Sequence, residues 1–396
     1  MLATPIYLDH MATTPVDPRV LEAMLPYFST HFGNAASRAH AFGWVAAEAV
    51  ERARAQVASL LGAASPQEIV FTSGATESNN LAIKGVAAAY RERGKHLITC
   101  ATEHKAVLDC FHSLERQGYQ VTRVPVDRFG VVELEPLESA LTEQTILVSI
   151  MAANNEIGTV QPLGHIGELA RSRGVLWHCD AAQAAGKIPL DVGELGVDLL
   201  SVSGHKVYGP KGVGALYVRT RRPRLRLQPQ LEGGGQERGL RSGTLNVPGI
   251  VGLGRACELC QQEREQEAER LARLRGRLYH GIADQVEGVV RNGHPQECLP
   301  GNLHLSFTGI DGSALLLALR ELALSSGSAC TSGAVSPSHV LKAIGVPDEL
   351  GQSSLRFGLG RSTTAEEIEY TAGRVVEEVE RLRAAAPVLP PALVDG

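Results

Sequence analysis

Six short apolar runs, separated by longer amphipathic stretches, dominate the sequence between about residues 50 and 220. The runs are EIVFT, HLITC, TILVSIM, VLWHCD, DLLSVS and GALYV. Strand-length runs that alternate with helical stretches are typical of a parallel α/β sheet, and continuous Val, Ile and Leu indicate helices on both faces. Such sheets bind ligands in the loops beyond the carboxyl ends of their strands. We therefore expect the functional side chains directly after each run.

The length of 396 residues predicts two to three domains, at roughly 150 residues for each. The charged amphipathic stretch ACELCQQEREQEAERLARLRGRLYHGI predicts a long helix that leads into a second domain. We assign residues 15–255 to a large α/β domain with a mainly parallel sheet between helices. Residues 1–14 and 256–396 are assigned to a smaller α+β domain. Its glycine- and serine-rich segment, about residues 325–338, is expected to be mobile.

Charge and cysteine content exclude several classes of protein. The net charge of −5 gives no broad basic surface, so no direct nucleic-acid partner is expected. The beginning MLATPIYLDH lacks a secretory signal, and no run approaches the ~18 apolar residues of a membrane span. An odd total of seven cysteines favours a reducing compartment over a disulfide framework. These features predict a cytoplasmic protein without a membrane partner.

Lys206 and Asp180 are the two residues that carry the chemical prediction. Lys206 follows the DLLSVS run, in SGHKVYGPKG, where a lysine can act as a Schiff-base nucleophile, although alone it is more often a surface charge. Asp180 ends the run VLWHCD, where its alternative role is a strand-end cap. Pyridoxal phosphate needs both groups, because a lysine binds its aldehyde and an acid keeps its pyridine nitrogen protonated.

Three further segments place polar groups after predicted strands. FTSGATESNNLAIKG begins a helix at Thr76, where the chain can bind a phosphate or form a plain capping box. His104 in CATEHKAVL can stack on a ring or transfer protons, or it can be structural. Asn155 in MAANNEIGTVQP suits a phenolic oxygen or a substrate carboxylate, and suits a turn equally well.

A thiol and a guanidinium complete the set of candidate groups. Cys330 lies among small and hydroxyl residues in SSGSACTSGAVSPSH, which favours an exposed, mobile nucleophile over a buried structural cysteine. Arg356 in SSLRFGLGR can clamp a carboxylate through two hydrogen bonds. Cys257 and Cys260 form a CxxC pair inside a predicted helix without a second pair, so we expect no metal site.

Together these segments resemble the cysteine desulfurases of the NifS/IscS type, which belong to the fold-type I, class V aminotransferase-like pyridoxal phosphate enzymes. The resemblance extends along most of the chain, in the family's order and approximate spacing. It rests on the segments YLDHMATTPVDPRV, FGNAASRAH, FTSGATESNNLAIKG, TEHKAVLD, NNEIGTVQP, DAAQAAGK, SGHKVYGPKG, GGGQERGLRSGT and SSGSACTS.

The resemblance implies a homodimer with pyridoxal 5′-phosphate bound near the interface. Lys206 would bind the cofactor as a Schiff base, Asp180 would pair with the pyridine nitrogen, and Gln183 would contact the phenolic oxygen. His104 would stack on the ring and transfer protons. The phosphate would be held by Ala75, Thr76, Ser203, His205 and, from a second subunit, Thr244.

The resemblance also implies the reaction, in which L-cysteine is converted to L-alanine. Asn155, beside the cofactor, would bind the substrate carboxylate together with Arg356. The Cys330 thiolate would take the sulfur as a persulfide and pass it to an acceptor protein for iron–sulfur cluster assembly or tRNA thiolation. The alternatives are a selenocysteine lyase or another class V enzyme and, from a different class, a non-catalytic assembly subunit. The thiol argues against a transaminase, and the intact Lys206, Asp180 and Cys330 argue against an assembly subunit.

Overall fold

The computed structural model describes residues 2–220, 225–326 and 338–385. Cys330 and most of the segment predicted to be mobile lie outside the described residues. None of the helices in these three ranges combines the length and the apolar character that a membrane crossing requires.

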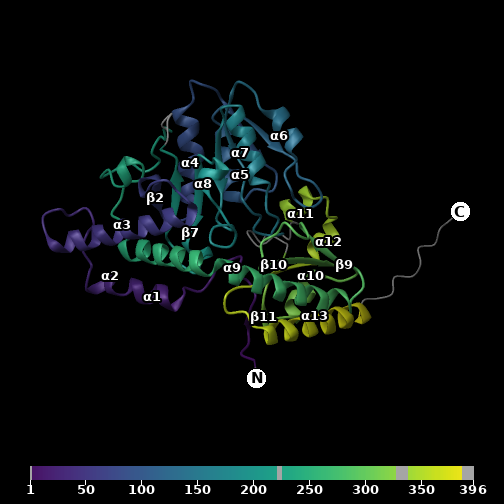
Figure 1. The fold of residues 1–396 in the computed structure, drawn as a ribbon. Coiled ribbons are helices and arrows are strands. Elements are labelled where there is room, and N and C mark those ends of the chain that lie inside the picture. The colour runs from purple at the N-terminus through teal and green to yellow at the C-terminus, as the bar shows by residue number, and fades with distance from the viewer. Residues whose placement is uncertain (1, 221–224, 327–337, 386–396) are drawn as a thin grey trace.

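A seven-stranded, mainly parallel sheet forms the larger part of the molecule (Figure 1). All six predicted runs are strands of this sheet, which confirms the predicted α/β class. In spatial order the strands are β2 (Ile69–Thr72), β8 (Gly214–Val218), β7 (Leu199–Ser203), β6 (Leu176–Asp180), β5 (Thr145–Ser149), β3 (His96–Cys100) and β4 (Gln120–Val124).

Two details of the sheet differ from the sequence prediction. Strand β8 runs antiparallel to both β2 and β7, because the connection of residues 204–213 is too short for the crossover that a parallel neighbour needs. Strand β4 was missed, because its sequence QVTRV lies at the sheet edge and only Val124 is buried. A half-exposed edge strand lacks the continuous apolar run that identified the others.

Helices cover both faces of this sheet, as the alternation of neighbouring strand residues shows. On β6, Trp177 packs into one hydrophobic core with helices α3 and α9, whereas Leu176 packs into a second core with α4 and α5. The helices of this part are α1 (Pro18–Met24), α2 (Pro26–Ser29), α3 (Ala41–Leu61), α4 (Ala75–Ala89), α5 (Lys105–Glu115), α6 (Leu134–Ala140), α7 (Leu163–Ser172) and α8 (Val192–Leu195). Both faces are therefore buried, and the polar groups collect at the strand ends.

The predicted long helix is present as α9 (Val247–Ala283). A second, smaller sheet lies beyond it (Figure 1). The sheet is antiparallel, in the order β12 (Ser325–Ser326), β13 (Ser354–Gly358), β10 (Asn302–Phe307) and β9 (Val289–Asn292). It packs on α9 with α10 (Gly312–Ala318) and α13 (Ala365–Ala385), next to α11 (His339–Ala343) and α12 (Asp348–Gln352). Strand β1 (Ile6–Tyr7) pairs with β11 (Leu322–Ala323). The boundary predicted near residue 255 falls inside α9.

A buried ion pair joins the glycine-rich segment after β8 to the main sheet. The Arg54 guanidinium on α3 donates two hydrogen bonds of 2.7 Å to the Glu237 carboxylate, and both side chains are almost fully buried. The same carboxylate accepts from the backbone N–H of Phe71 on β2, at 2.7 Å. The Glu237 carboxylate thereby accepts hydrogen bonds from a helix and from a strand at once.

Replacing Glu237 by alanine should lower the free energy of unfolding by about 3–5 kcal/mol, because the buried guanidinium then loses its buried counter-charge and keeps only the exposed Glu51 carboxylate. Glu48→Ala is the matched control, since Glu48 pairs with Arg52 on the exposed face of α3, the helix that carries Arg54. This control should lower the free energy of unfolding by less than about 1 kcal/mol. Urea unfolding of both variants measures the difference. Equal costs would show that the buried pair does not stabilise the fold.

Candidate active site

A cavity of about 660 Å³ lies at the carboxyl ends of the central strands. Its walls include all of the predicted site residues except Thr244 and Cys330. The predicted residues that line it are Ala75, Thr76, His104, Asn155, Asp180, Gln183, Ser203, His205, Lys206 and Arg356. Thr244 is exposed and is not among the lining residues. Cys330 lies outside the described residues. The cavity is therefore the candidate active site.

Lys206 ends the short 3-10 helix (Gly204–Lys206) that follows β7. Its Nζ donates to the backbone carbonyls of Met11 at 2.6 Å and Ala12 at 2.8 Å. Burial, with the nearby charge of Arg356, lowers the pKa of Lys206 to about 8, against the opposing effects of Asp9 and Asp180. The amine is thus held in place and loses its proton more readily than an ordinary lysine.

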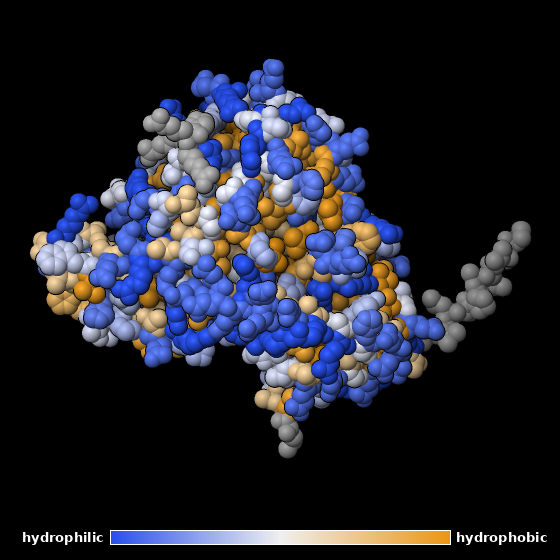
Figure 2. All heavy atoms as spheres, in the orientation of Figure 1, coloured by the Kyte–Doolittle hydropathy of each residue, from blue (hydrophilic) through white to orange (hydrophobic). Residues whose placement is uncertain are grey.

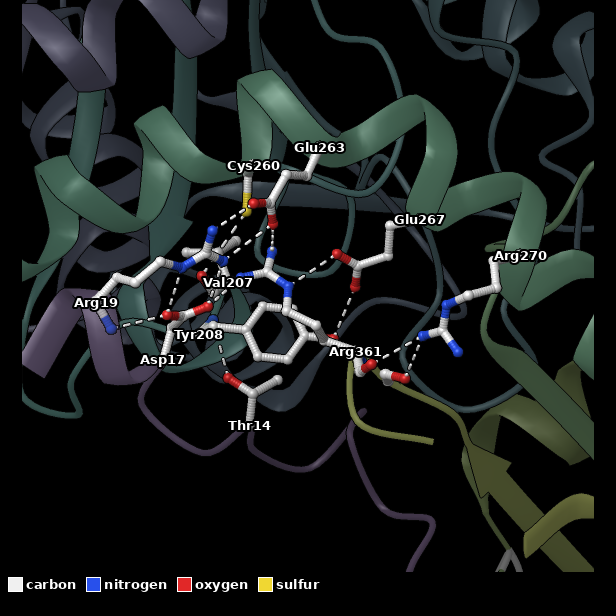
Figure 3. Close-up of polar contacts among 11 residues, drawn as sticks. Thr14, Asp17, Arg19, Val207, Tyr208, Cys260, Glu263, Glu267, Arg270 and Arg361 are labelled. Atoms are coloured by element: carbon white, nitrogen blue, oxygen red, sulfur yellow. Dashed lines mark hydrogen bonds and ion pairs between the residues drawn. The ribbon is translucent and has the colours of Figure 1, made fainter. Parts of the chain in front are cut away.

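An ion network holds the turn that follows Lys206 (Figure 3). Tyr208 has a φ of 62°, and its backbone N–H donates to Thr14 Oγ1 at 2.9 Å. Its hydroxyl donates to Glu267 on α9 at 3.0 Å and accepts from the backbone N–H of Arg361 at 2.7 Å. The Arg361 guanidinium lies 4.2 Å from the centre of the Tyr208 ring. These contacts fix a backbone conformation that a tyrosine rarely adopts.

Asp180 is the last residue of β6 and presents a hydrogen-bonded carboxylate to the cavity. Oδ2 accepts from Asn79 Nδ2 at 2.7 Å, and Oδ1 accepts from the backbone N–H of Ala182 at 3.0 Å. Two donors stabilise the ionised form, which is the form that pairs with a protonated pyridine nitrogen. Asn79, fully buried on α4, is a functional residue that the sequence analysis missed. Its place one turn into the predicted phosphate-binding helix was the available signal.

The beginning of α4 supplies an anion site. Gly74 is the N-cap of this helix, with a φ of 152°, and no side chain caps it. The capping-box alternative is therefore wrong for this helix, since such a box needs a Ser or Thr at that position. Ala75 and Thr76 form the first turn at the positive end of this helix and line the cavity together with the buried hydroxyl residue Ser203.

Arg356 is fixed at the cavity wall by three groups. Nη2 lies 2.8 Å from Asp9 Oδ1 and donates to Ser325 Oγ at 3.0 Å, and Nη1 donates to the carbonyl of Asn155 at 2.8 Å. Nε is buried and has no hydrogen-bond partner among the described residues. Asp9 is the second residue that the sequence analysis missed, because it lies 347 residues away in the chain.

The two histidines of the cavity differ in their surroundings. His104 is the N-cap of α5, exposed to the cavity, and its Nδ1 accepts from the backbone N–H of Ala106 at 3.1 Å. Its Nε2 is consequently the atom free to exchange protons with a ligand. His205 is hydrogen-bonded to Thr13 at 3.2 Å. Burial lowers the pKa of His205 to about 4, as does Lys206, so this ring is neutral at pH 7.

A family model described as aminotransferase class-V matches residues 6–371. Among the most similar relatives is a cysteine desulfurase IscS of Anaeromyxobacter dehalogenans, 57% identical over 97% of this chain and 95% of the relative. The human cysteine desulfurase is 56% identical over 97% of this chain and 84% of the relative.

Two solved structures match the described fold. One is a NifS-like protein, 42% identical, with a TM-score of 0.89 over 95% of this chain and 100% of that chain. The other is SspA in complex with cysteine, 41% identical, with a TM-score of 0.81 over 89% of this chain and 98% of that chain.

In the cofactor-free protein the free energy of unfolding should rise between about pH 8 and pH 10.5, the pKa values of Lys206 in the folded state and of an unperturbed lysine. In this window the unfolded chain binds the extra proton, so raising the pH favours the folded state. Lys206→Met should reduce the rise, and the exposed Lys342→Met should leave it unchanged. Denaturant unfolding across the pH range measures both slopes, and an unreduced slope in Lys206→Met would contradict the lowered pKa.

Proposed function

The chain belongs to the aminotransferase class-V family and is a cysteine desulfurase, and we propose that its cavity takes sulfur from L-cysteine, leaving L-alanine and a persulfide on Cys330. The observation that carries this proposal is the meeting of Lys206, Asp180 and the uncapped start of α4 in one cavity. The proposal needs three binding groups, which are a lysine that binds the cofactor covalently, a partner for its pyridine nitrogen and a site for its phosphate.

Members of this family use pyridoxal phosphate, and the residues present fit it. Lys206 would bind the aldehyde, Asp180 the pyridine nitrogen, and Gln183 the phenolic oxygen. The phosphate would lie at Ala75 and Thr76, where the helix start presents backbone donors without a side-chain cap. When bound, the cofactor ring accepts the electron pair left at the substrate's α-carbon.

The chain's own residues would bind and orient the substrate. Arg356 would hold the substrate carboxylate beside Asn155, with Asp9 balancing the guanidinium charge while the cavity is free of substrate. Lys206 is the base best suited to remove the α-proton, because its lowered pKa leaves an appreciable fraction of free amine near neutral pH. His104 Nε2 would carry protons at the mouth of the cavity.

The Cys330 thiolate would then attack the substrate sulfur. A sulfur–sulfur bond forms as the carbon–sulfur bond breaks, and the electron pair of the broken bond stays with the carbon skeleton. The skeleton regains the α-proton, takes up the proton released by the Cys330 thiol and leaves as L-alanine, while the substrate's thiol proton stays on the persulfide. The persulfide passes to an acceptor protein that serves iron–sulfur cluster assembly or tRNA thiolation, within the cytoplasm. A thiol that is reachable from solution suits both the attack and the transfer.

Cys330→Ser should abolish the release of both alanine and sulfide from L-cysteine in the presence of a thiol reductant, because the sulfur acceptor is lost. The wild type should release the two products in equal amounts. Cys298→Ser, which removes a partly exposed thiol outside the cavity, should match the wild type. Full activity of Cys330→Ser would disprove the persulfide step, and alanine release from selenocysteine alone would make the protein a selenocysteine lyase.

A second copy of the chain is proposed to cover an exposed aromatic patch formed by Phe28, Phe32, Phe42 and Trp44. These side chains are 53–64% exposed and extend from α2 to the start of α3. Figure 2 shows apolar side chains gathered at that end of the molecule. The Phe32 and Phe42 ring centres lie 5.3 Å apart, so these two rings are in contact. Aromatic clusters of this kind are typical of interface centres.

The double variant Phe32→Asp, Trp44→Asp should convert a wild-type dimer to a monomer, because two charges would be buried without partners at the interface. Sedimentation velocity measures the change. Leu317→Asp is the matched control, since Leu317 is 68% exposed on α10, far from the patch in sequence, and should leave the dimer intact. A monomeric wild type, or a variant that remains dimeric, would contradict this interface.

A further inference from the structure

A second lysine, Lys187, lies behind Lys206. It follows the turn at Gly186, which has a φ of 73°, and its side chain is partly buried. Lys187 and Lys206 line the same small cavity between the main sheet and α9, together with Glu267. Lys206 also lines the active-site cavity, whereas Lys187 does not. Lys187 therefore acts on the site only through other residues.

The contact that matters is between Lys187 and the Gln183 carboxamide. Lys187 Nζ donates to Gln183 Oε1 at 2.9 Å, and Gln183 Nε2 donates to the carbonyl of Met11 at 2.8 Å. Lys206 Nζ donates to that same carbonyl at 2.6 Å. A continuous chain of hydrogen bonds thus leads from one lysine to the other through a single amide and a single carbonyl.

The direction of this chain follows from donor and acceptor chemistry. A carboxamide can turn by half a rotation, and its two ends are then exchanged. An ammonium group is a donor only and the Met11 carbonyl is an acceptor only, so the amide end next to Lys187 is the oxygen. The Gln183 Nε2 donor is consequently directed to the Met11 carbonyl, on the side where Lys206 lies.

Groups of both signs surround Lys187. The titratable or charged groups that face its amine are His10, His205, Lys206, Cys260, Glu267 and Arg356. Burial, with the nearby charges of Lys206 and Arg356, lowers the pKa of Lys187 to about 7, against the opposing effects of Cys260 and Glu267. Even when deprotonated, the amine keeps N–H donors for Gln183 Oε1.

We propose that Lys187 is a positioning residue that orients the Gln183 carboxamide, so that its Nε2 donor serves the phenolic oxygen of pyridoxal phosphate bound at Lys206. The proposal rests on the function proposed above, because it needs the cofactor in the cavity. It adds a residue to the site that touches neither substrate nor cofactor. Without Lys187, only the Met11 carbonyl still opposes a turn of the amide that would present its oxygen to the phenolic oxygen, removing a donor and adding a repulsion.

The test is a pH titration of the visible absorbance of the bound cofactor. This absorbance follows the proton on the nitrogen that joins the cofactor to Lys206. A donor to the phenolic oxygen favours the deprotonated form, so Lys187→Met should raise the titration midpoint by about one pH unit. Gln183→Glu, which leaves only acceptors, should raise the midpoint in the same direction. Lys84→Met, a partly buried lysine on α4, should leave it unchanged.

A double-mutant cycle separates positioning from a direct effect of charge. In a Gln183→Leu background, Lys187→Met should shift the midpoint by at most about 0.3 pH units, because the amide is gone. An equal shift in both backgrounds, or no shift in either, would overturn the proposal. A wild-type protein that binds the cofactor without a titrating, Lys206-dependent absorbance would instead overturn the proposed function, and the inference with it.

Discussion

The carbonyl of Met11 accepts hydrogen bonds from both Lys206 and Gln183, and the arrangement of the site depends on this shared acceptor. The carbonyl belongs to the N-terminal segment, which pairs with β11 through Ile6 and Leu322 and bridges to the smaller sheet through Asp9 and Gly358. A buried ammonium without acceptors would be strongly destabilised. The N-terminal segment therefore supplies a fixed acceptor, which holds two donors side by side at the carboxyl ends of the main strands.

A second constraint operates on the opposite side of Lys206. Arg361 pairs with Asp17 at the start of α1 and with Glu267 on α9, at 2.6 and 3.0 Å. Its backbone N–H binds the hydroxyl of Tyr208, two residues after Lys206. Arg361 lies five residues after Arg356, so the segment proposed to bind the substrate carboxylate also supports the turn that carries the lysine. The proposed substrate site and the proposed cofactor site therefore share one scaffold.

The sequence was informative where one local pattern determined the structure. Buried parallel strands are continuous apolar runs, and polar residues directly after them converge at one edge, which is why residues such as Lys206 and Asp180 could be predicted. Other cavity residues, such as Gln183, were implied only by the resemblance to the family. Contacts between distant segments leave no local pattern. Asn79 and Asp180 are 101 residues apart, and the contact of Lys206 with Met11 spans 195 residues. The sequence left both a phosphate site and a capping box open at the start of α4, since a glycine N-cap next to Ser, Thr and Glu looks like a capping box until the backbone is seen.

The central claim is that Lys206 is the residue that binds the cofactor, and reductive trapping tests it most directly. Borohydride treatment of the cofactor-loaded protein, followed by peptide mass spectrometry, locates the lysine that carries the reduced cofactor. The account predicts a single modified peptide, the one that contains Lys206. A reduced cofactor on Lys187 or Lys211, or no covalent adduct at all, would contradict it.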